Sequence, residues 1–416
     1  MNSKFYFLSL LLLVLFSAQT SFATEPTVEE LRSMGPAGLQ VLMTRHAGEI
    51  NRHIANPSLA PDEEWQRITT ALDTVAQQKN SYLSGLYWHT EMESAKRAAA
   101  ASGKPILSLR LLGKLTDEFS CANSRFFRTV LYSNTEVSTV LRDRFVLHWQ
   151  SVRPVPTVTI DFGDGRKLER TLTGNSIHYI LDSQGRPIDA LPGLYGPQAF
   201  LRGLTNAETF FKSLTGKNDQ QRNFMLTMYY SQQHNKISAA WTIDTEKIGG
   251  KKPEGFRIVK GTNGEALSIA PLAVTKALTE VNILRAMTTA TEELGKITDE
   301  AAWKKIAQLH SSDAAIDERS ISLIKRQNPA LREQEFAGLL QKFQELIALD
   351  TVRNEYLLHS KLYTWLAKDP VRDDVEKLNE QVYAKLFLTP GSDPWLGLFS
   401  TDVYTALDNG GVVKPR

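Results

Sequence analysis

The sequence contains one cysteine, Cys121, among 416 residues. A single thiol excludes an internal disulfide and any zinc or iron–sulfur site that needs several thiolates from one chain. The charged residues nearly cancel, with 48 Lys and Arg against 46 Asp and Glu, for a net charge of +2. Nucleic-acid-binding proteins usually carry a clear basic surplus. We therefore expect no nucleic-acid partner and no thiolate metal centre.

Long apolar runs are also scarce. The run from Phe5 to Phe16 follows the positive charge of Lys4 and precedes small residues at Ser21 and Ala23. This pattern is typical of a secretory signal peptide, and the run is shorter than the roughly 18–20 residues that span a bilayer. An uncleaved anchor is the alternative. We expect a signal peptide over residues 1–23, an exported protein (periplasmic or secreted) and no integral membrane span.

The remaining chain divides by its periodicity. Residues 24–85 carry apolar positions at helical spacing and predict an N-terminal helical hairpin. Residues 86–214 alternate helical patterns with short apolar runs, which indicates an α/β domain. Residues 215–265 are polar with glycine clusters and predict an irregular linker. Residues 266–416 are almost entirely helical in pattern and predict an all-α C-terminal domain.

The α/β region predicts a mixed sheet flanked by helices. Helices are expected at 91–102, from 121 past 130, after 134 and over 196–214, with strands at 104–112, 145–152, 177–181 and 187–191 and a hairpin over 156–172. Two strands joined by helices favour a parallel pair, and strands joined by a short turn favour an antiparallel pair. Both kinds of pair therefore occur in one sheet.

Three segments of this region resemble a known family. An Ala-rich helix leads into Gly103-Lys104-Pro105-Ile106-Leu107, Cys121-Ala122-Asn123-Ser124 stands at a helix start, and the stretch from Gly174 to Pro187 matches a final strand–turn–strand. Together they resemble thioredoxin-fold proteins of the secreted type, fused here to a helical region without a recognised relative. The resemblance implies an α/β thioredoxin-like domain over residues 86–214.

The resemblance also implies where a site would lie. Cys121 and Ser124 match the catalytic Cys-x-x-Cys positions, with serine in place of the resolving cysteine. Phe119-Ser120 stands where thioredoxins usually have a tryptophan, and the segment facing the thiol lacks the family's cis-proline. The binding residues expected around the thiol are Asn123, Arg125, Asn175, Ser176 and Ile177.

Chemistry at Cys121 would follow from its place at a helix start. Unpaired N–H groups and the helix dipole favour a thiolate there, and Arg125 would strengthen this effect if its side chain folds back. Ser124 would hydrogen-bond the thiolate. Without a resolving cysteine, the mixed disulfide is released only by the substrate's second thiol or a small thiol. This predicts cofactor-free monothiol exchange, isomerase-like on protein disulfides or deglutathionylating on glutathione-type thiols.

The alternative is a buried cysteine that only caps the helix. The thioredoxin-like domain is then a non-catalytic scaffold, and the helical C-terminal domain recognises a protein or envelope partner. Exposure and acidity of the Cys121 thiol favour exchange, whereas burial favours the scaffold.

Histidines supply the other candidates. His46, Glu49 and His53 share a helix face and could ligate a metal, but a solvated polar face explains the same spacing, and we expect no metal site.

His148 and His178 fall on predicted strands near Cys121 and could act as a base for the thiol or be core residues. Glu355 and His359 lie four residues apart without the second histidine of a zinc-protease helix, which predicts a helix-surface pair.

Overall fold

The computed structural model describes residues 25–171, 174–250, 253, 300–368 and 370–387. The predicted signal peptide, part of the predicted linker and the chain after 387 lie outside these residues.

The N-terminal segment contains more helices than the predicted hairpin. They are α1 (Val28–Ser33), α2 (Pro36–Arg45), α3 (Ala47–Ala55), α4 (Glu63–Ala76) and α5 (Ser81–Ser84). Gly35 has φ +69° and ends the first helix, and a Cβ on Gly38 would lie 1.9 Å from the carbonyl oxygen of Leu31. The sharp turn and the close approach separate α1 from α2. These helices pack around a second core that includes Leu39 and Trp65, and Leu323 of the C-terminal region joins it.

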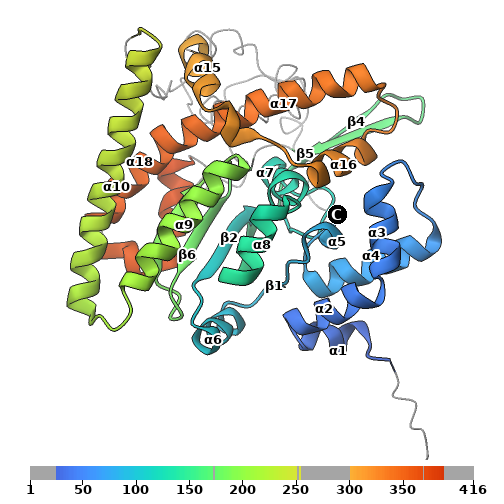
Figure 1. The fold of residues 1–416 in the computed structure, drawn as a ribbon, viewed down its shortest axis with the longest axis horizontal. Helices are drawn as coiled ribbons and strands as arrows, with labels where there is room; N and C mark the ends of the chain where they lie inside the picture. Colours follow the sequence, from blue (N-terminus) through green and yellow to red (C-terminus); the bar gives the residue numbers. More distant parts are fainter. Residues whose placement is uncertain (1–24, 172–173, 251–252, 254–299, 369, 388–416) are drawn as a thin grey trace, which may run out of the picture.

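A five-stranded mixed sheet forms the centre of the fold (Figure 1). Its order is β1 (Trp88–His89), β3 (Val146–Arg153), β2 (Ile106–Leu112), β6 (Ile177–Leu181) and β7 (Pro187–Pro192). β1 and β2 pair with β3 in parallel, and β6 pairs antiparallel with both β2 and β7. The predicted mixed sheet is confirmed, and its order is compatible with the thioredoxin-like resemblance.

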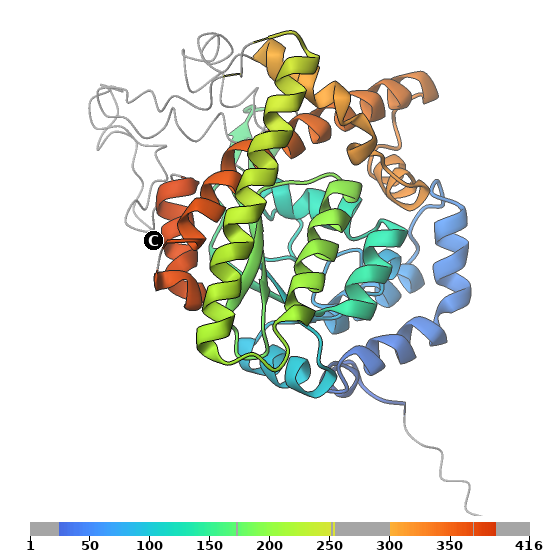
Figure 2. The same ribbon diagram turned by 60° about the vertical axis from the view of Figure 1, so that its left-hand side comes forward.

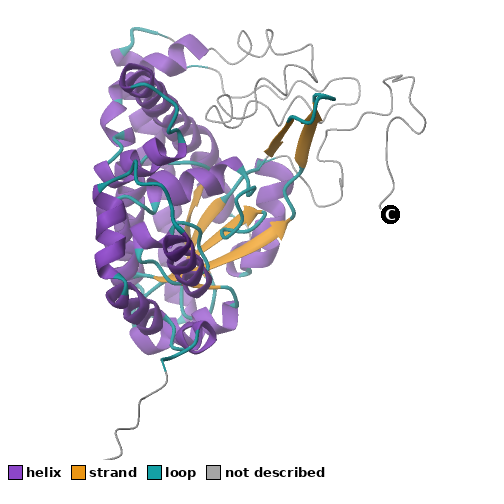
Figure 3. Ribbon diagram, turned by 90° about the vertical axis from the view of Figure 1, so that its right-hand side faces the viewer, coloured by secondary structure: helices purple, strands orange, loops and turns teal. Residues whose placement is uncertain are grey.

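Helices cover this sheet, as expected. They are α6 (Met92–Ser102), α7 (Ala122–Phe126), the π-helix η1 (Phe127–Leu131), α8 (Thr135–Arg144) and α9 (Pro197–Ser213). Every residue of β2, β6 and β7 is buried, as continuous apolar strands covered on both faces require. The predicted hairpin consists of β4 (Thr157–Asp161) and β5 (Lys167–Thr171), and Figure 3 shows it standing away from the main sheet.

The predicted irregular linker is wrong over much of its length. Residues Asp219–Lys247 form α10, a helix of 29 residues that begins with a capping box between Asn218 and Gln221. Figure 2 shows α10 between α9 and the C-terminal helices. Its buried positions, among them Leu226, Tyr230 and Ile237, are sparse along a mostly polar helix, which hides the periodicity from the sequence. No helix of the described residues is long and apolar enough to cross a bilayer.

The C-terminal region is helical where the structure describes it. Its elements are α15 (Glu300–Leu309), η3 (Ser311–Ala314), α16 (Glu318–Gln327), α17 (Glu333–Arg353), the π-helix η4 (Asn354–His359), α18 (Ser360–Leu366), η5 (Pro370–Asp373), α19 (Val375–Gln381) and the π-helix η6 (Val382–Leu386). These helices share one continuous hydrophobic core with the sheet. The helical half therefore packs as part of the same body.

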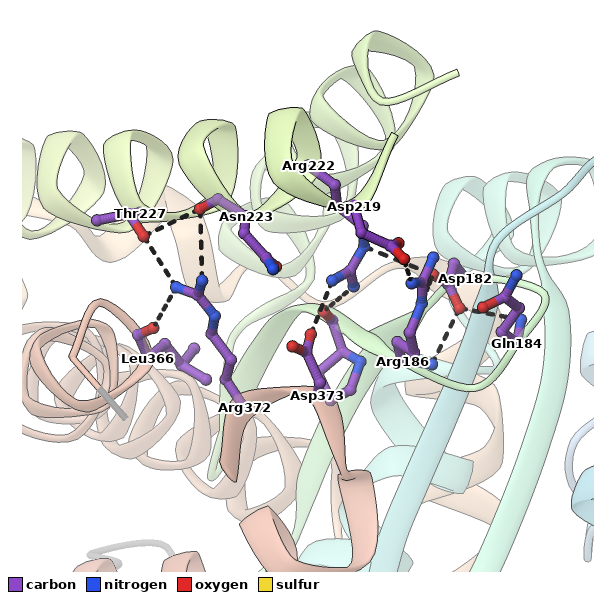
Figure 4. A network of polar contacts seen from close by, with 11 residues as sticks. Asp182, Gln184, Arg186, Asp219, Arg222, Asn223, Thr227, Leu366, Arg372 and Asp373 are labelled. Atoms are coloured by element: carbon purple, nitrogen blue, oxygen red, sulfur yellow. Dashed lines mark hydrogen bonds and ion pairs between the residues drawn. The ribbon is translucent and has the colours of Figure 1, made fainter. Parts of the chain in front are cut away.

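An arginine-rich network ties α10 to both halves (Figure 4). Arg222 is buried and donates to Asp373 of η5 at 2.7 Å and to the carbonyl of Pro187 at the start of β7 at 3.1 Å. Arg186, in the turn before β7, bonds Asp219 at the start of α10 at 2.9 Å. These charged contacts fix the angle of α10 across the sheet.

Candidate functional site

Cys121 occupies the N-cap position of α7, as the sequence predicts. Its N–H donates to the carbonyl of Leu112 at the end of β2 at 3.4 Å, and its Sγ accepts from the N–H of Ser124 at 3.5 Å. The side chain is 0% exposed. The cysteine therefore meets the helix start, but solvent does not reach the thiol.

The structure brings the two predicted segments of the site together. The Asn123 side-chain amide donates to Ser176 Oγ at 3.0 Å, and both residues are buried. A Cβ on Gly174 would lie 2.4 Å from the Cβ of Cys121. Only glycine fits at this contact, and its φ of +133° is also one that glycine adopts at little cost. Ile177 begins β6 and pairs with Arg110 in the sheet.

Ser124 bonds the sulfur through its backbone, and the Arg125 side chain bonds Thr171. It is the Ser124 N–H that bonds sulfur, while its buried hydroxyl has no hydrogen-bond partner in the described part of the chain. The Arg125 guanidinium donates to Thr171 of β5 at 2.8 Å. The expected hydrogen bond from Ser124 to the sulfur is therefore made by its backbone N–H, and the Arg125 guanidinium has Thr171 as its hydrogen-bond partner.

A second arginine, Arg128, interacts electrostatically with the Cys121 thiol. Arg128 is buried in η1 and donates to the carbonyls of Asp117 and Glu118. Burial lowers the pKa of Arg128 to about 10, against the opposing charges of Glu118 and, more weakly, Cys121. The sequence marked Arg125 because it is closer along the chain, whereas the helical turn and the π-helix direct Arg128 inward.

The helical half closes the site. The hydroxyl of Tyr383, in η6, donates to the backbone carbonyl of Asn175 at 2.8 Å, and Tyr383 is itself buried. Burial, and then the negative charge of a Cys121 thiolate, raises the pKa of Tyr383. A residue more than 200 positions along the chain therefore covers the segment that faces the thiol.

His148 and His178 are core residues in neutral form. His148 Nδ1 lies 2.9 Å from Ser108 Oγ, and burial, followed by the charges of Arg110 and His89, lowers its pKa to about 3. His178 Nε2 lies 2.7 Å from the hydroxyl of Tyr132, and burial lowers its pKa to about 3. Each histidine therefore forms a buried hydrogen bond with a neighbouring hydroxyl group.

The N-terminal histidine face is not a solvated one. His53 is buried and its ring stacks on Trp65 with centroids 3.8 Å apart, whereas His46 ends α2. Within the described ranges, no group of three or more His, Cys, Asp or Glu side chains could hold a metal ion.

A polar cavity lies where the sheet meets the helical half. Its volume is about 280 Å³, near the lower end of the about 300–1,000 Å³ typical of small-molecule pockets. The wall comes from β7, α9, α10, η3, α17, η4 and α18. Glu355 and His359 belong to this wall, so the predicted helix-surface pair is wrong. His359 is 4% exposed.

His359 lies between two carboxylates. Its Nδ1 is 2.9 Å from Glu355 Oε2, and its Nε2 is 3.8 Å from Asp189 Oδ1, beyond hydrogen-bond distance. The hydroxyl of Tyr229 donates to the other oxygen of Asp189 at 2.5 Å, and the ring of Tyr363 stacks on His359 at 4.2 Å. Burial lowers the pKa of His359, but the negative charge and hydrogen bond of Glu355, together with the charge of Asp189, outweigh it and raise the pKa to about 9.

The loop from β7 to α9 places a tyrosine in the same cavity. A Cβ on Gly193 would lie 2.6 Å from the Asn354 amide, which donates to the carbonyl of Leu194 at 2.8 Å. A Cβ on Gly196 would lie 2.2 Å from a carbonyl oxygen of η3. Glycine at both positions lets the helical half approach closely and holds Tyr195 between them. In the sequence, the glycine–proline pattern Pro-Gly-Leu-Tyr-Gly-Pro over residues 192–197 is the feature that could have pointed to this loop.

Comparison with protein-family models, with curated proteins and with solved structures finds no match. The chemistry of the chain's own residues is therefore the basis for assigning a function.

Proposed function

We propose that this chain is an exported thioredoxin-like protein that acts by binding, in which Cys121 caps a helix and does not serve as a nucleophile. The burial of Cys121 beneath the Tyr383–Asn175 contact carries this proposal. A thiolate attacks a disulfide only when the sulfur atom of the substrate reaches it, and reactive cysteines are correspondingly accessible. The sheet order, with Cys121 following its central strand, supports the thioredoxin-like assignment.

One contact favours monothiol exchange as the second candidate. The N–H of Ser124 lies 3.5 Å from Sγ, and a donor at a helix start stabilises a thiolate. Exchange with a protein disulfide or a glutathione adduct would require η6 to move away and expose Cys121. The two functions therefore differ in whether the native protein opens.

The deciding experiment is alkylation of Cys121 in the folded, mature protein as a function of pH, with Cys121→Ser as the blank. We expect labelling only at the rate of global unfolding. Tyr383→Ala should speed labelling because it removes the cover, whereas Tyr383→Phe keeps the ring and should label slowly. Fast labelling of the native protein with a midpoint well below about 8.5 would overturn the binding proposal and favour exchange.

Export has a separate test. The exported chain should begin at Thr24 when its N-terminus is sequenced, because the predicted cleavage follows Ala23. Recovery of the full-length chain in the membrane fraction would instead favour an uncleaved anchor.

A further inference from the structure

We propose that the cavity between β7, α9, α10 and η4 binds a small, neutral, polyhydroxylated ligand of monosaccharide size. The inference goes beyond the proposed function, because the cavity has no lining residue in common with the surroundings of Cys121 described above. It would stand if Cys121 proved reactive.

Two buried polar atoms at the cavity wall have no hydrogen-bond partner in the part of the chain that the structure describes. Among the described residues the Tyr195 hydroxyl has no partner in good hydrogen-bond geometry, although Glu355 lies close enough to raise the pKa of Tyr195 further than burial alone. His359 Nε2 also has no partner within hydrogen-bond distance among these residues, since Asp189 Oδ1 lies 3.8 Å away. Tyr195 is 2% exposed and His359 4%, and a buried polar group without a hydrogen bond is unfavourable. A ligand oxygen placed between them would supply both missing bonds.

The same wall offers an acceptor beside these donors. Glu355 uses Oε2 for His359, and 35% of its side chain remains exposed. Asn206 and Gln233 add side-chain amides to the lining. A hydroxyl group both donates and accepts, so neighbouring hydroxyls on one ring can satisfy this alternating set.

The charges of the wall already balance. Arg202 forms a bidentate pair with Asp313, with both N–O distances 2.6 Å. His310 lies 2.5 Å from Asp244, an ion pair that forms when His310 is protonated. Asp189 and Glu355 flank His359, and the exposed Lys236 also lines the wall. A ligand with a net charge would leave one of these groups without compensation, and burying such a charge is costly.

Aromatic rings complete the lining. Tyr356 and Tyr363 contribute to the wall with Leu191 and Val352. Small-molecule sites combine such apolar surface with a few polar groups that fix orientation. Rings on the wall suit the C–H face of a sugar, while its hydroxyl edge meets Glu355 and Tyr195.

The test is a ligand-observed NMR titration of the full mature chain. The neutral probes are glucose, galactose, mannose and N-acetylglucosamine, and the charged probes are glucosamine and glucuronate, which keep the ring but add a positive or a negative charge. We expect at least one neutral sugar to bind more tightly than both charged rings. The absence of binding by every neutral probe, or tighter binding of glucosamine or glucuronate, would overturn the proposal.

Variants separate the cavity from general stability. Tyr195→Phe removes a hydroxyl that has no partner in good hydrogen-bond geometry among the described residues, so folding should be unchanged while affinity for the bound sugar falls about three- to tenfold. Tyr230→Phe is the matched control, because its hydroxyl is also buried without a hydrogen bond but does not line the cavity. Equal affinity in both variants would overturn the assignment of the site, whatever the alkylation of Cys121 shows.

Discussion

Gly174 lies against Cys121 so closely that a Cβ at position 174 would stand 2.4 Å from the Cβ of the cysteine. This contact joins the start of α7 to the segment before β6, and it covers the Gly174 side of the buried cysteine. The two segments that the sequence analysis expected to form one site are thus packed against each other, with Tyr383 bonded to the next residue, Asn175.

Gly174→Ala should therefore destabilise the fold. Overpacking of a filled core costs about 1–3 kcal/mol, and the φ of +133° adds strain for alanine. Gly103→Ala is the control, because its φ of +69° is also unfavourable but nothing lies within 4 Å of the added methyl. Urea unfolding of both variants isolates the contact with Cys121; equal losses would show that the clash is relieved at no cost.

Because of His359, the free energy of unfolding should fall as the pH rises into the alkaline range. Its folded pKa of about 9 exceeds the ordinary value of 6.5, so its protonated form contributes stability in full below about pH 6.5. That contribution is lost as the pH rises from 6.5 through 9. His359→Gln should flatten the free energy of unfolding between pH 6.5 and 9. An unchanged slope in this variant would contradict the ion pairs with Glu355 and Asp189.

His148 should make the folded protein less stable as the pH falls into the acid range. Burial depresses its folded pKa to about 3, so its contribution is present above 6.5 and lost as the pH falls from 6.5 toward 3, by up to about 1.4 kcal/mol per pH unit. His148→Gln should reduce the acid sensitivity of unfolding between pH 4 and 6.5. His178 should behave in the same way, and a ring signal of either residue that titrates near 6.5 would contradict the neutral core assignment.

Arg222 should be important for the position of α10. Arg222→Ala leaves Asp373 and the carbonyl of Pro187 without their donor. The expected loss is about 2–4 kcal/mol, below that of a fully enclosed pair because Asp373 is 42% exposed. Arg166→Ala, which removes an exposed ion pair with Asp164, should change stability by less than about 1 kcal/mol. Thermal unfolding of the two variants compares the sites directly.

The sequence by itself determined the elements whose signals are local. Alternation and apolar runs placed β2, β3, the β4–β5 hairpin, β6 and β7, and the helix start at Cys121 followed from the residues around it. The mixed character of the sheet followed from the lengths of the connections. The 29-residue α10 escaped prediction because its few buried positions are diluted by polar ones.

Only the tertiary structure decided which distant residues these elements contact. Tyr383 covers Asn175 from 208 residues away, and His359 faces Asp189 across the boundary between sheet and helices. Neither contact leaves a periodic or compositional trace, because each depends on how whole layers pack and not on neighbours along the chain. For the same reason Cys121, exposed or buried, looks identical in the sequence, and Glu355 with His359 reads as a surface pair until β7 and Tyr195 enclose it.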